Sequence, residues 1–329
     1  MNSSLKADHH IAVVIPSFKV TKFIVDVIEK MGPEVSSIFV IDDCCPDKSG
    51  DFVEANISDP RVKVIRHTEN QGVGGAVITG YRAAIGAGAD IIVKVDGDGQ
   101  MDPKLIPLFI APIVSQDADY TKGNRFYDII ELHRMPRLRL VMNAALSMLN
   151  KLSSGYWNVF DPTNGFTAIH AGVARLLPFE KINKRYFFET DMLFRLNLIR
   201  AVVVDVPMDA VYGDEVSNIR YTRALWDFSR GHLRNFVKRI GYNYFLRDMS
   251  AASFELFIGI PLMLFGFGFG LRSWWLSITA GAPSTPGTVM LAGLPVIIGL
   301  QLLLSFISYD VSSLPTRPRQ KTLRTSPSK

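Results

Sequence analysis

The sequence predicts a Rossmann-like α/β domain with a mostly parallel sheet, followed by a juxtamembrane amphipathic helix and two transmembrane helices. Two observations predict this fold class. Between residues 11 and 220, short β-branched runs alternate with helical patterns, which is typical of parallel strands that are buried on both faces. Beyond residue 250, two long apolar stretches have the length that a bilayer span requires.

The strand candidates are short runs that are apolar on both faces. They are residues 11–15, 38–41, 62–65, 91–95 and 202–206. Helical patterns separate the first four runs, and they cover residues 21–31, 50–57 and 74–88. Strands that alternate with helices in this way form a parallel sheet, whose ligands bind beyond the carboxyl ends of the strands.

Polar residues follow three of these runs at the point where each run ends. They are Pro16 and Ser17, then Asp42 and Asp43, then Asp96, Asp98 and Gln100. Because parallel strands deliver their carboxyl ends to one edge of a sheet, we expect these residues to meet there. Asp42 and Asp43 can bind a base or a ribose at this edge, or they can cap the turn in the sequence DDCCPD.

Asp96 and Asp98 are two carboxylates that are separated by one glycine directly after a predicted strand. Such a pair can chelate one hard cation from a tight turn, and Gln100 adds a neutral oxygen to the same turn. Mg²⁺ is usually held by one or two carboxylates, with substrate phosphates completing its coordination. The pattern therefore predicts a site for Mg²⁺ or Mn²⁺ at Asp96, Asp98 and Gln100.

The glycine-rich segment Gly72–Gly75 follows a predicted strand and opens a helix. It does not fit the dinucleotide-binding pattern G-x-G-x-x-G, because position 77 is Val77 and because the loop before it, residues 66–71, is too long for a tight first turn. The glycines either let the backbone approach a ligand or ease the packing of the helix. The sequence leaves both readings open.

Two further groups of charged residues are candidates for the site. Four arginines follow one another with little acid between them, namely Arg125, Arg134, Arg137 and Arg139. Guanidinium groups suit phosphate, but a solvated basic loop has the same pattern. Glu189 and Asp191 lie in YFFETDMLF, where they either suit the dipole at a helix N-terminus or place a carboxylate near a sugar or an acceptor.

Composition excludes several classes of function. The net charge of +5 comes from the tail beyond Asp310, and the rest of the chain is near neutral, so composition supplies no basic face for nucleic acid. The two cysteines, Cys44 and Cys45, are adjacent, which suits neither a disulfide framework nor a zinc site. We expect reduced thiols.

The N-terminal residues 1–10 form a polar tail without the apolar core of a signal peptide. We therefore expect a domain over residues 11–220 that stays in the cytosol. Residues 221–250 follow as an amphipathic region, in which Trp226 and Leu233 share an apolar stripe beside several arginines. This pattern is typical of a helix at an anionic bilayer surface, and a helix packed on the domain shares it.

Residues 251–309 carry both apolar stretches and are predicted to form a transmembrane hairpin; a buried soluble hairpin is the alternative. Basic residues gather before the hairpin and in the tail, residues 310–329, whereas only Arg272 lies between the stretches. This distribution predicts that both termini are cytoplasmic. Small residues at 266, 268 and 270 offer a smooth surface for close helix contact, so we expect a homo-oligomer.

Seven motifs in residues 11–220 resemble, in sequence and in order, those of family 2 glycosyltransferases with a GT-A fold. The motifs are VVIPSF, VIDDCCPD, NQGVGGAVITGY, VKVDGDGQMDP, KGNR, DPTNGFTAI and FFETDML. The chain is most similar to polyprenyl-phosphate glycosyltransferases, namely dolichol-phosphate mannosyltransferases and bactoprenol glucosyltransferases. Two C-terminal spans after a juxtamembrane helix fit the bactoprenol group.

The resemblance implies roles for individual residues. The metal on the donor diphosphate would be held by Asp96, Asp98 and Gln100. The nucleotide sugar would be bound by Pro16, Ser17, Asp42, Asp43 and Asp96. The acceptor phosphate would be held by Arg125, Arg139 and Asn143. Asp191 matches the acidic residue that often supplies a base, and the catalytic set would be Asp98, Asp191, Arg125 and Arg139.

The chain departs from the family pattern in one place. Relatives often carry P-x-Y-N-E after the first strand, where this chain has Pro16-Ser17-Phe18-Lys19-Val20, so the base and the sugar of the donor stay open. The processive synthases carry Q-x-x-R-W, which does not occur in this sequence.

The resemblance, together with the metal pattern and the two spans, implies metal-dependent, inverting transfer of a hexose from a donor of the UDP-glucose or GDP-mannose type to a polyprenyl phosphate at the cytoplasmic face of the inner membrane. A phosphate monoester has a second pKa of ~6 and attacks without a strong base, which weighs against Asp191 as a base. Two alternatives stand beside this reading. One is an anchored transferase that acts on a saccharide or protein acceptor, and the other is an inactive nucleotide-binding protein.

Overall fold

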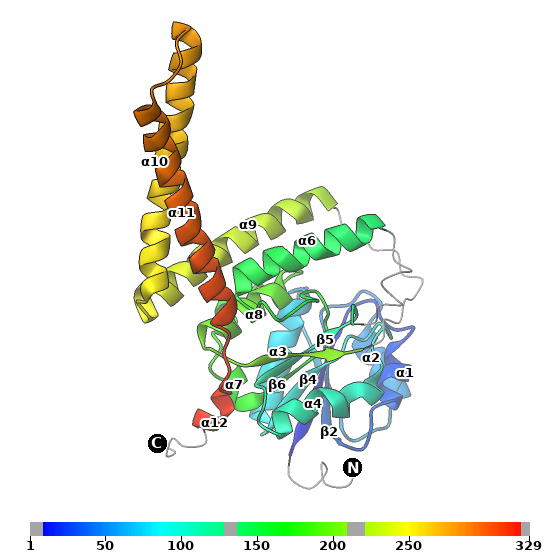
Figure 1. Ribbon diagram of the computed structural model, residues 1–329. Coiled ribbons are helices and arrows are strands. Elements are labelled where there is room, and N and C mark those ends of the chain that lie inside the picture. Colours follow the sequence, from blue (N-terminus) through cyan, green and yellow to red (C-terminus); the bar gives the residue numbers. More distant parts are fainter. Residues whose placement is uncertain (1–8, 128–136, 209–220, 324–329) are drawn as a thin grey trace. The chain divides into compact units, whose positions relative to one another are not determined.

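The computed structural model describes residues 9–127, 137–208 and 221–323 (Figure 1). Residues 1–8 of the predicted polar tail, Arg134 and residues 324–329 of the basic tail lie outside these ranges. The chain divides into two compact units. The first comprises residues 1–236 and 315–329, and the second comprises residues 237–314. This division falls inside the predicted amphipathic region.

Seven strands of the described residues form one sheet in the first unit, in the order β3-β2-β1-β4-β6-β5-β7. The strands are β1 (Ile11–Ser17), β2 (Val35–Asp42), β3 (Val62–Arg66), β4 (Ile91–Lys94), β5 (Tyr120–Asn124), β6 (Thr167–His170) and β7 (Val203–Pro207). Only β6 runs antiparallel to its neighbours β4 and β5 among these pairs. The mostly parallel α/β sheet predicted from the sequence is confirmed.

Helices cover both faces of this sheet (Figure 1). In the described part of the chain, the sheet is accompanied by α1 (Ile24–Glu29), α2 (Ser49–Asn56), α3 (Val73–Gly86), α4 (Ile106–Val114), α6 (Arg137–Ser154) and α7 (Ala171–Ala174). On one face, α1, α2 and α4 share a buried core with inward residues of β1 and β2, such as Ile15 and Val40. On the other face, α3 packs against β1 and β2.

Three further helical segments complete the first unit around the sheet. They are α8 (Phe188–Leu198), α9 (Tyr221–Ile240) and α12 (Arg319–Leu323), beside short 3-10 turns at Pro103–Leu105 and Phe179–Lys181. The observed strands β1 to β4 and β7 confirm the five predicted runs. The sequence pattern missed β5 and β6, because β5 reads Tyr-Thr-Lys-Gly-Asn and β6 has four residues.

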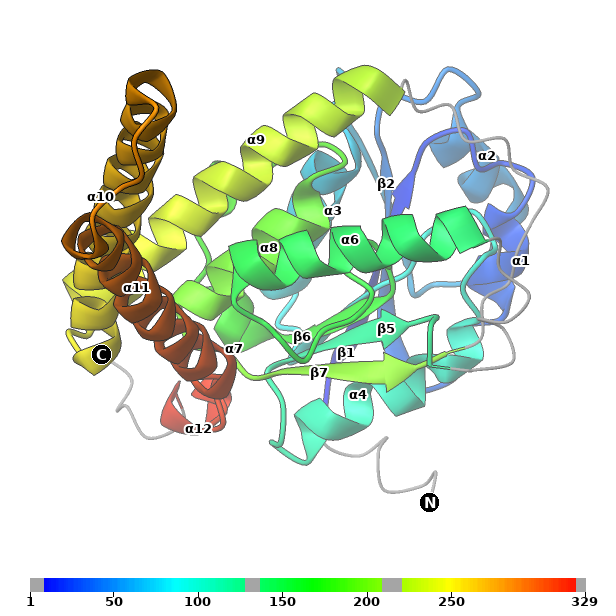
Figure 2. The same ribbon diagram turned by 45° about the horizontal axis from the view of Figure 1, so that its top comes forward.

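Helices α6 and α9 lie side by side (Figure 2) and are joined by a hydrogen bond of 2.8 Å between Ser153 Oγ and His232 Nδ1. Both helices also present apolar side chains to solvent. On α6 these include Val141 and Met142, and on α9 Trp226 is 71% and Leu233 64% exposed. Isolated apolar residues are ordinary on a protein surface, but neighbouring helices that both expose them mark an interaction surface.

The second unit is built from the end of α9, a π-helical turn (Gly241–Arg247) and two long helices, α10 (Ala251–Ala280) and α11 (Pro286–Ser312). Both long helices have the length and composition of membrane spans, and only 11% of each apolar window is buried within the structure. A soluble core helix would bury this surface. The predicted pair of candidate transmembrane helices is therefore present in the fold.

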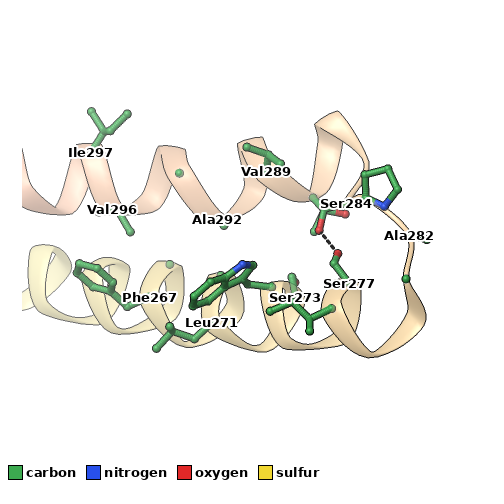
Figure 3. A pocket seen from close by; sticks show the side chains of 18 residues that line it. Phe267, Leu271, Ser273, Ser277, Ala282, Ser284, Val289, Ala292, Val296 and Ile297 are labelled. Atoms are coloured by element: carbon green, nitrogen blue, oxygen red, sulfur yellow. Dashed lines mark hydrogen bonds between the residues drawn. The ribbon is translucent and has the colours of Figure 1, made fainter.

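Small residues let α10 and α11 approach each other. A Cβ at Gly266 would crowd Val296 on α11, so this glycine serves contact within the chain, whereas Gly268 has open space beside it. Near the turn between the helices lies an open groove of about 890 Å³, which is lined by small residues and by larger ones such as Phe267 and Leu271 (Figure 3). There Ser277 and Ser284 satisfy each other through a hydrogen bond of 2.6 Å.

A buried ion pair joins the two ends of the second unit. Arg239, in the last turn of α9, lies 2.6 Å from Asp310 near the end of α11, and both residues are buried. The Tyr244 hydroxyl also donates to the Asp310 carboxylate. Breaking one partner of such a pair leaves an uncompensated buried charge, which costs about 3–5 kcal/mol.

The chain returns to the first unit after α11. The Asp119 carboxylate accepts hydrogen bonds from the backbone N–H groups of Arg319 and Gln320 at 2.7 and 2.8 Å. The Gln320 amide donates to the backbone carbonyls of Ile113 and Ala118, and Gln320 is 1% exposed. Gln320, within the predicted basic tail, is thus buried in the domain that carries the sheet.

Candidate active site

The Asp96 and Asp98 turn follows the carboxyl end of β4, as the sequence predicted. Both residues are partly exposed. The Asp98 carboxylate accepts the backbone N–H of Gln100 at 3.0 Å, which closes the turn. The Asp96 carboxylate lies 2.9 Å from the Lys94 Nζ atom. The two carboxylates therefore belong to one tight turn at the edge of the sheet.

Lys94 is the centre of a charge cluster that sequence reasoning missed. Its side chain is 1% exposed, and its Nζ atom lies 3.2 Å from Glu189 on α8 as well as beside Asp96. Burial alone would lower the pKa of Lys94, but the carboxylates of Asp96 and Glu189 outweigh it and hold this pKa well above its usual value. Lys94 is therefore a fixed cation at neutral pH.

The donor set at this turn fits a hard divalent cation. Asp96, Asp98 and Gln100 offer oxygen ligands, which Mg²⁺ and Mn²⁺ prefer. Among the described residues, no three or more acidic, histidine or cysteine side chains gather at a single point. The protein alone thus supplies too few ligands for an enclosed cage, as expected where substrate phosphates complete the coordination.

Gly165, in the DPTNGFTAI motif, lets the chain approach this cluster closely. A Cβ at this position would collide with the Asp96 carboxylate and the Lys94 ammonium. The backbone from Asn164 to Phe166 therefore passes directly beside the two charged groups. Any larger residue would displace Asp96 or Lys94.

The predicted nucleoside residues lie at the ends of β1 and β2, and their side chains differ in what they contact. Asp42 is buried, and its two carboxylate oxygens accept the N–H groups of Cys45 and Gly50, each at 2.8 Å. The Ser17 hydroxyl is buried and has no hydrogen-bond partner within the described chain, so it has capacity for a ligand. Pro16 pairs with Ile41 in the sheet.

Asp43 organises the glycine-rich segment. Its carboxylate accepts the N–H groups of Gln71 and Gly72 at 2.8 Å each and lies 2.7 Å from His67 Nδ1. Gly72 has a φ of +85°, which favours glycine. A Cβ at Gly74 would crowd Phe188 on α8. Of the two readings left open by the sequence, these contacts favour helix packing.

The predicted acceptor residues lie on the turn after β5 and on α6. Arg125 donates to both oxygens of Asp161, at 2.8 and 3.2 Å, and Asp161 is fully buried. This bidentate pair fixes the guanidinium of Arg125, whose side chain is 31% exposed. Asn143 lies on α6 and is partly exposed. Arg139 also belongs to α6, and its side chain lies outside the described part of the chain.

Glu189 and Asp191 face different surroundings, because residues two apart on a helix point about 200° apart. Glu189 faces Lys94, whose ammonium also contacts Asp96. Asp191 is fully buried, and its carboxylate accepts the N–H of Asn183 at 2.9 Å and the amide of Asn235 on α9 at 3.0 Å. It also lies 3.3 Å from Arg195.

A second buried lysine lies on β5 and yields a prediction for the pH dependence of stability. Lys122 is fully buried, and burial lowers its pKa to about 8 from an ordinary value of 10.5. Because the unfolded chain holds this proton more tightly, Lys122 contributes stability that is fully present above pH 10.5 and is lost as the pH falls through 8. The loss is about 3 kcal/mol.

We expect the wild type to gain thermal stability relative to Lys122→Met as the pH rises from 8 to 10.5. Methionine has a similar length and carries no charge, so the comparison isolates this ionisation. The measurement is the unfolding midpoint in detergent at several pH values for both proteins. Parallel midpoints across this range would contradict the assignment.

Comparisons with known proteins agree with this geometry. Residues 12–177 match the model of glycosyl transferase family 2. The undecaprenyl-phosphate mannosyltransferase of Micrococcus luteus is 32% identical over 54% of this chain and 72% of its own. The UDP-N-acetylglucosamine–dolichyl-phosphate N-acetylglucosaminyltransferase of Methanococcus voltae is 30% identical over 68% of this chain and 93% of its own.

A solved structure shows the same fold. Glucosyl-3-phosphoglycerate synthase from Mycobacterium tuberculosis, in complex with Mn²⁺, UDP and glucosyl-3-phosphoglycerate, covers 72% of this chain and 82% of its own with a TM-score of 0.53 and 20% identity. This similarity confirms the GT-A fold of the sheet domain. The family model, which covers half of the chain, shows that this protein is a member of glycosyl transferase family 2.

Proposed function

We propose that this protein transfers a hexose, with inversion, from a nucleoside diphosphate sugar to a polyprenyl phosphate at the cytoplasmic face of the membrane, with Mg²⁺ or Mn²⁺ as cofactor. The proposal rests on the occurrence of two features in one chain. The paired carboxylates of Asp96 and Asp98 follow β4 in a family 2 domain, and two helices of membrane-span length follow that domain.

The proposed binding of the sugar donor rests on the turn that carries Asp96, Asp98 and Gln100. Asp96, Asp98 and Gln100 would hold the cation, which would stabilise the negative charge of the departing nucleoside diphosphate. The solved relative with UDP and Mn²⁺ supports this assignment by its fold. Ser17, whose buried hydroxyl has no partner within the described residues, would bind the nucleoside beside Asp42 and Asp43.

The acceptor end rests on charge and on the membrane helices. Two relatives are named for undecaprenyl-phosphate and dolichyl-phosphate acceptors. In this chain Arg125, held rigid by Asp161, would position the acceptor phosphate, together with Arg139 and Asn143 on α6. The exposed apolar residues of α6 and α9 suit contact with a bilayer surface, where the head group of such a lipid lies.

The chemistry needs little help from a base. A phosphate monoester has a second pKa of ~6, so its oxygen is a nucleophile at neutral pH without losing a further proton. The task of the protein is to hold two phosphate groups close together, and fixed cationic side chains do this. The burial of Asp191, whose carboxylate accepts the amide of Asn235, supports this division of roles.

The proposed membrane topology follows from the way the chain is connected. The second unit begins at residue 237 and ends at residue 314, and the chain belongs to the first unit on both sides of it. A hairpin that starts and ends at the same domain crosses a bilayer an even number of times. This connection, with the basic residues that flank the hairpin, supports cytoplasmic positions for both termini.

The test is transfer of a labelled sugar into lipid that is extracted by organic solvent. Purified protein would be incubated with polyprenyl phosphate and a panel of UDP- and GDP-sugars. We expect metal-dependent labelling with at least one donor and its abolition by EDTA. Label that appears only on a saccharide or protein, or transfer that persists without metal, would contradict the proposal.

A further inference from the structure

The buried ammonium group of Lys94 lies beside the turn that carries Asp96 and Asp98, so a cation neighbours the proposed metal site. The Lys94 Nζ atom is 2.9 Å from the Asp96 carboxylate, so it occupies one of the oxygens expected to serve the metal. Glu189 holds the same ammonium from its other side at 3.2 Å. Lys94 is buried between these carboxylates, with 1% of its side chain exposed.

This arrangement sets the charge that an incoming cation meets. Asp96, Asp98 and Glu189 contribute three negative charges around the turn, and Lys94 offsets one of them from contact distance of Asp96. Repulsion between charges is stronger in a buried site than in water, because the local dielectric is low. The described residues also offer no third acidic ligand at the turn. The positive charge of Lys94 therefore repels a divalent cation that arrives at this turn alone.

A nucleoside diphosphate changes this balance. Its two phosphates bring negative charge and several oxygen ligands, which offset Lys94 and complete the coordination of the metal. We propose that Lys94 couples the binding of metal and donor, because its fixed positive charge disfavours a divalent cation at Asp96 and Asp98 until a diphosphate accompanies it. This inference rests on the proposed function, since it concerns the same donor site.

The direction in which metal affinity changes when Lys94 is removed distinguishes this coupling from a purely structural role. If Lys94 only holds Asp96 and Glu189 in place, its removal displaces a metal ligand and weakens the binding of metal. If Lys94 acts through its charge, its removal strengthens the binding of metal in the absence of nucleotide. By reciprocity, the factor by which nucleotide strengthens metal binding must then shrink.

The experiment measures Mn²⁺ binding to the full chain in detergent, from the electron paramagnetic resonance signal of free Mn²⁺. Titrations are made with Mn²⁺ alone, with UDP and with GDP. The variant Lys94→Met removes the charge and keeps a similar length. Lys63→Met, at an exposed lysine on β3, is the matched control. Because Lys94→Met leaves Glu189 without its partner, Glu189→Gln and the double variant repeat the comparison with no unpaired charge.

We expect Lys94→Met to bind Mn²⁺ alone at least about tenfold more tightly than the wild type, and the double variant to exceed Glu189→Gln in the same direction. Lys63→Met should match the wild type. Equal or weaker binding after Lys94→Met in both backgrounds would overturn the coupling and leave the proposed function intact. A wild type whose Mn²⁺ affinity rises with neither UDP nor GDP would overturn both the coupling and the proposed donor class.

Discussion

Replacing Asp98 by alanine is expected to lower the rate of sugar transfer at least about 100-fold, with little effect on folding. The Asp98 side chain is partly exposed in the turn after β4, so its removal opens no cavity in the core. The loss falls on the transition state, because the charge of the leaving diphosphate then lacks a correctly placed metal.

A matched control lies four residues further along the same loop. Asp102 caps the short helical turn at Pro103–Leu105, where its carboxylate accepts the N–H of Lys104 at 3.0 Å. Asp102→Ala removes an identical carboxylate and should keep transfer within a fewfold of the wild type, at the cost of a helix cap of about 1 kcal/mol. Comparable losses in both variants would show that loop stability, not metal chemistry, is measured.

The parts of the site that the sequence predicted are those whose signal is local. Asp96, Asp98 and Gln100 lie within five positions of one another, directly after a β-branched run, so one short pattern contains the strand, the turn and the ligands. The five predicted strands and the two membrane-length helices were found for the same reason. Their hydrophobic periods are complete within a single segment.

The parts that were missed depend on contacts between distant segments. Lys94 and Glu189 are 95 positions apart, and Arg125 and Asp161 are 36 apart. One signal was nevertheless available. A sheet covered on both faces buries every strand residue, so a lysine inside the run IIVKV has to be paired with a carboxylate. Lys122 in β5 is buried as well, but its ammonium donates to the backbone carbonyl of Asn164, and the polar residues of β5 concealed this strand.

The buried residue Gln320 shows a different limit of prediction from sequence patterns. Gln320 lies between charged residues, which is typical of a solvated tail, yet its amide satisfies two backbone carbonyls beside Asp119. A polar side chain that hydrogen-bonds to buried backbone groups in place of water produces no hydrophobic pattern in the sequence. Sequence patterns detect apolar burial and are blind to burial of this kind.

Replacing Asp191 by asparagine is expected to lower stability much more than it lowers the rate of transfer by the folded protein. The carboxylate links three segments, since Arg195 on α8, the N–H of Asn183 and the amide of Asn235 on α9 all meet it. Losing the charge leaves the guanidinium of Arg195 without its buried partner. The expected decrease in the free energy of unfolding is about 3 kcal/mol.

The rate of transfer per folded molecule, measured as a function of pH, shows whether Asp191 has a structural role or acts as a general base. A general base contributes about 10²–10⁴-fold, so its loss would reduce the rate by that factor and remove the limb of the pH profile in which the base becomes protonated. We expect less than a tenfold reduction and an unchanged profile, because the acceptor phosphate needs no base.

Asp26→Asn, at an exposed carboxylate on α1, is the control for stability and should shift the unfolding midpoint very little. A normal unfolding midpoint together with a 100-fold slower reaction would make Asp191 catalytic, and the acceptor would then have to be a group that must lose a proton, such as a sugar hydroxyl.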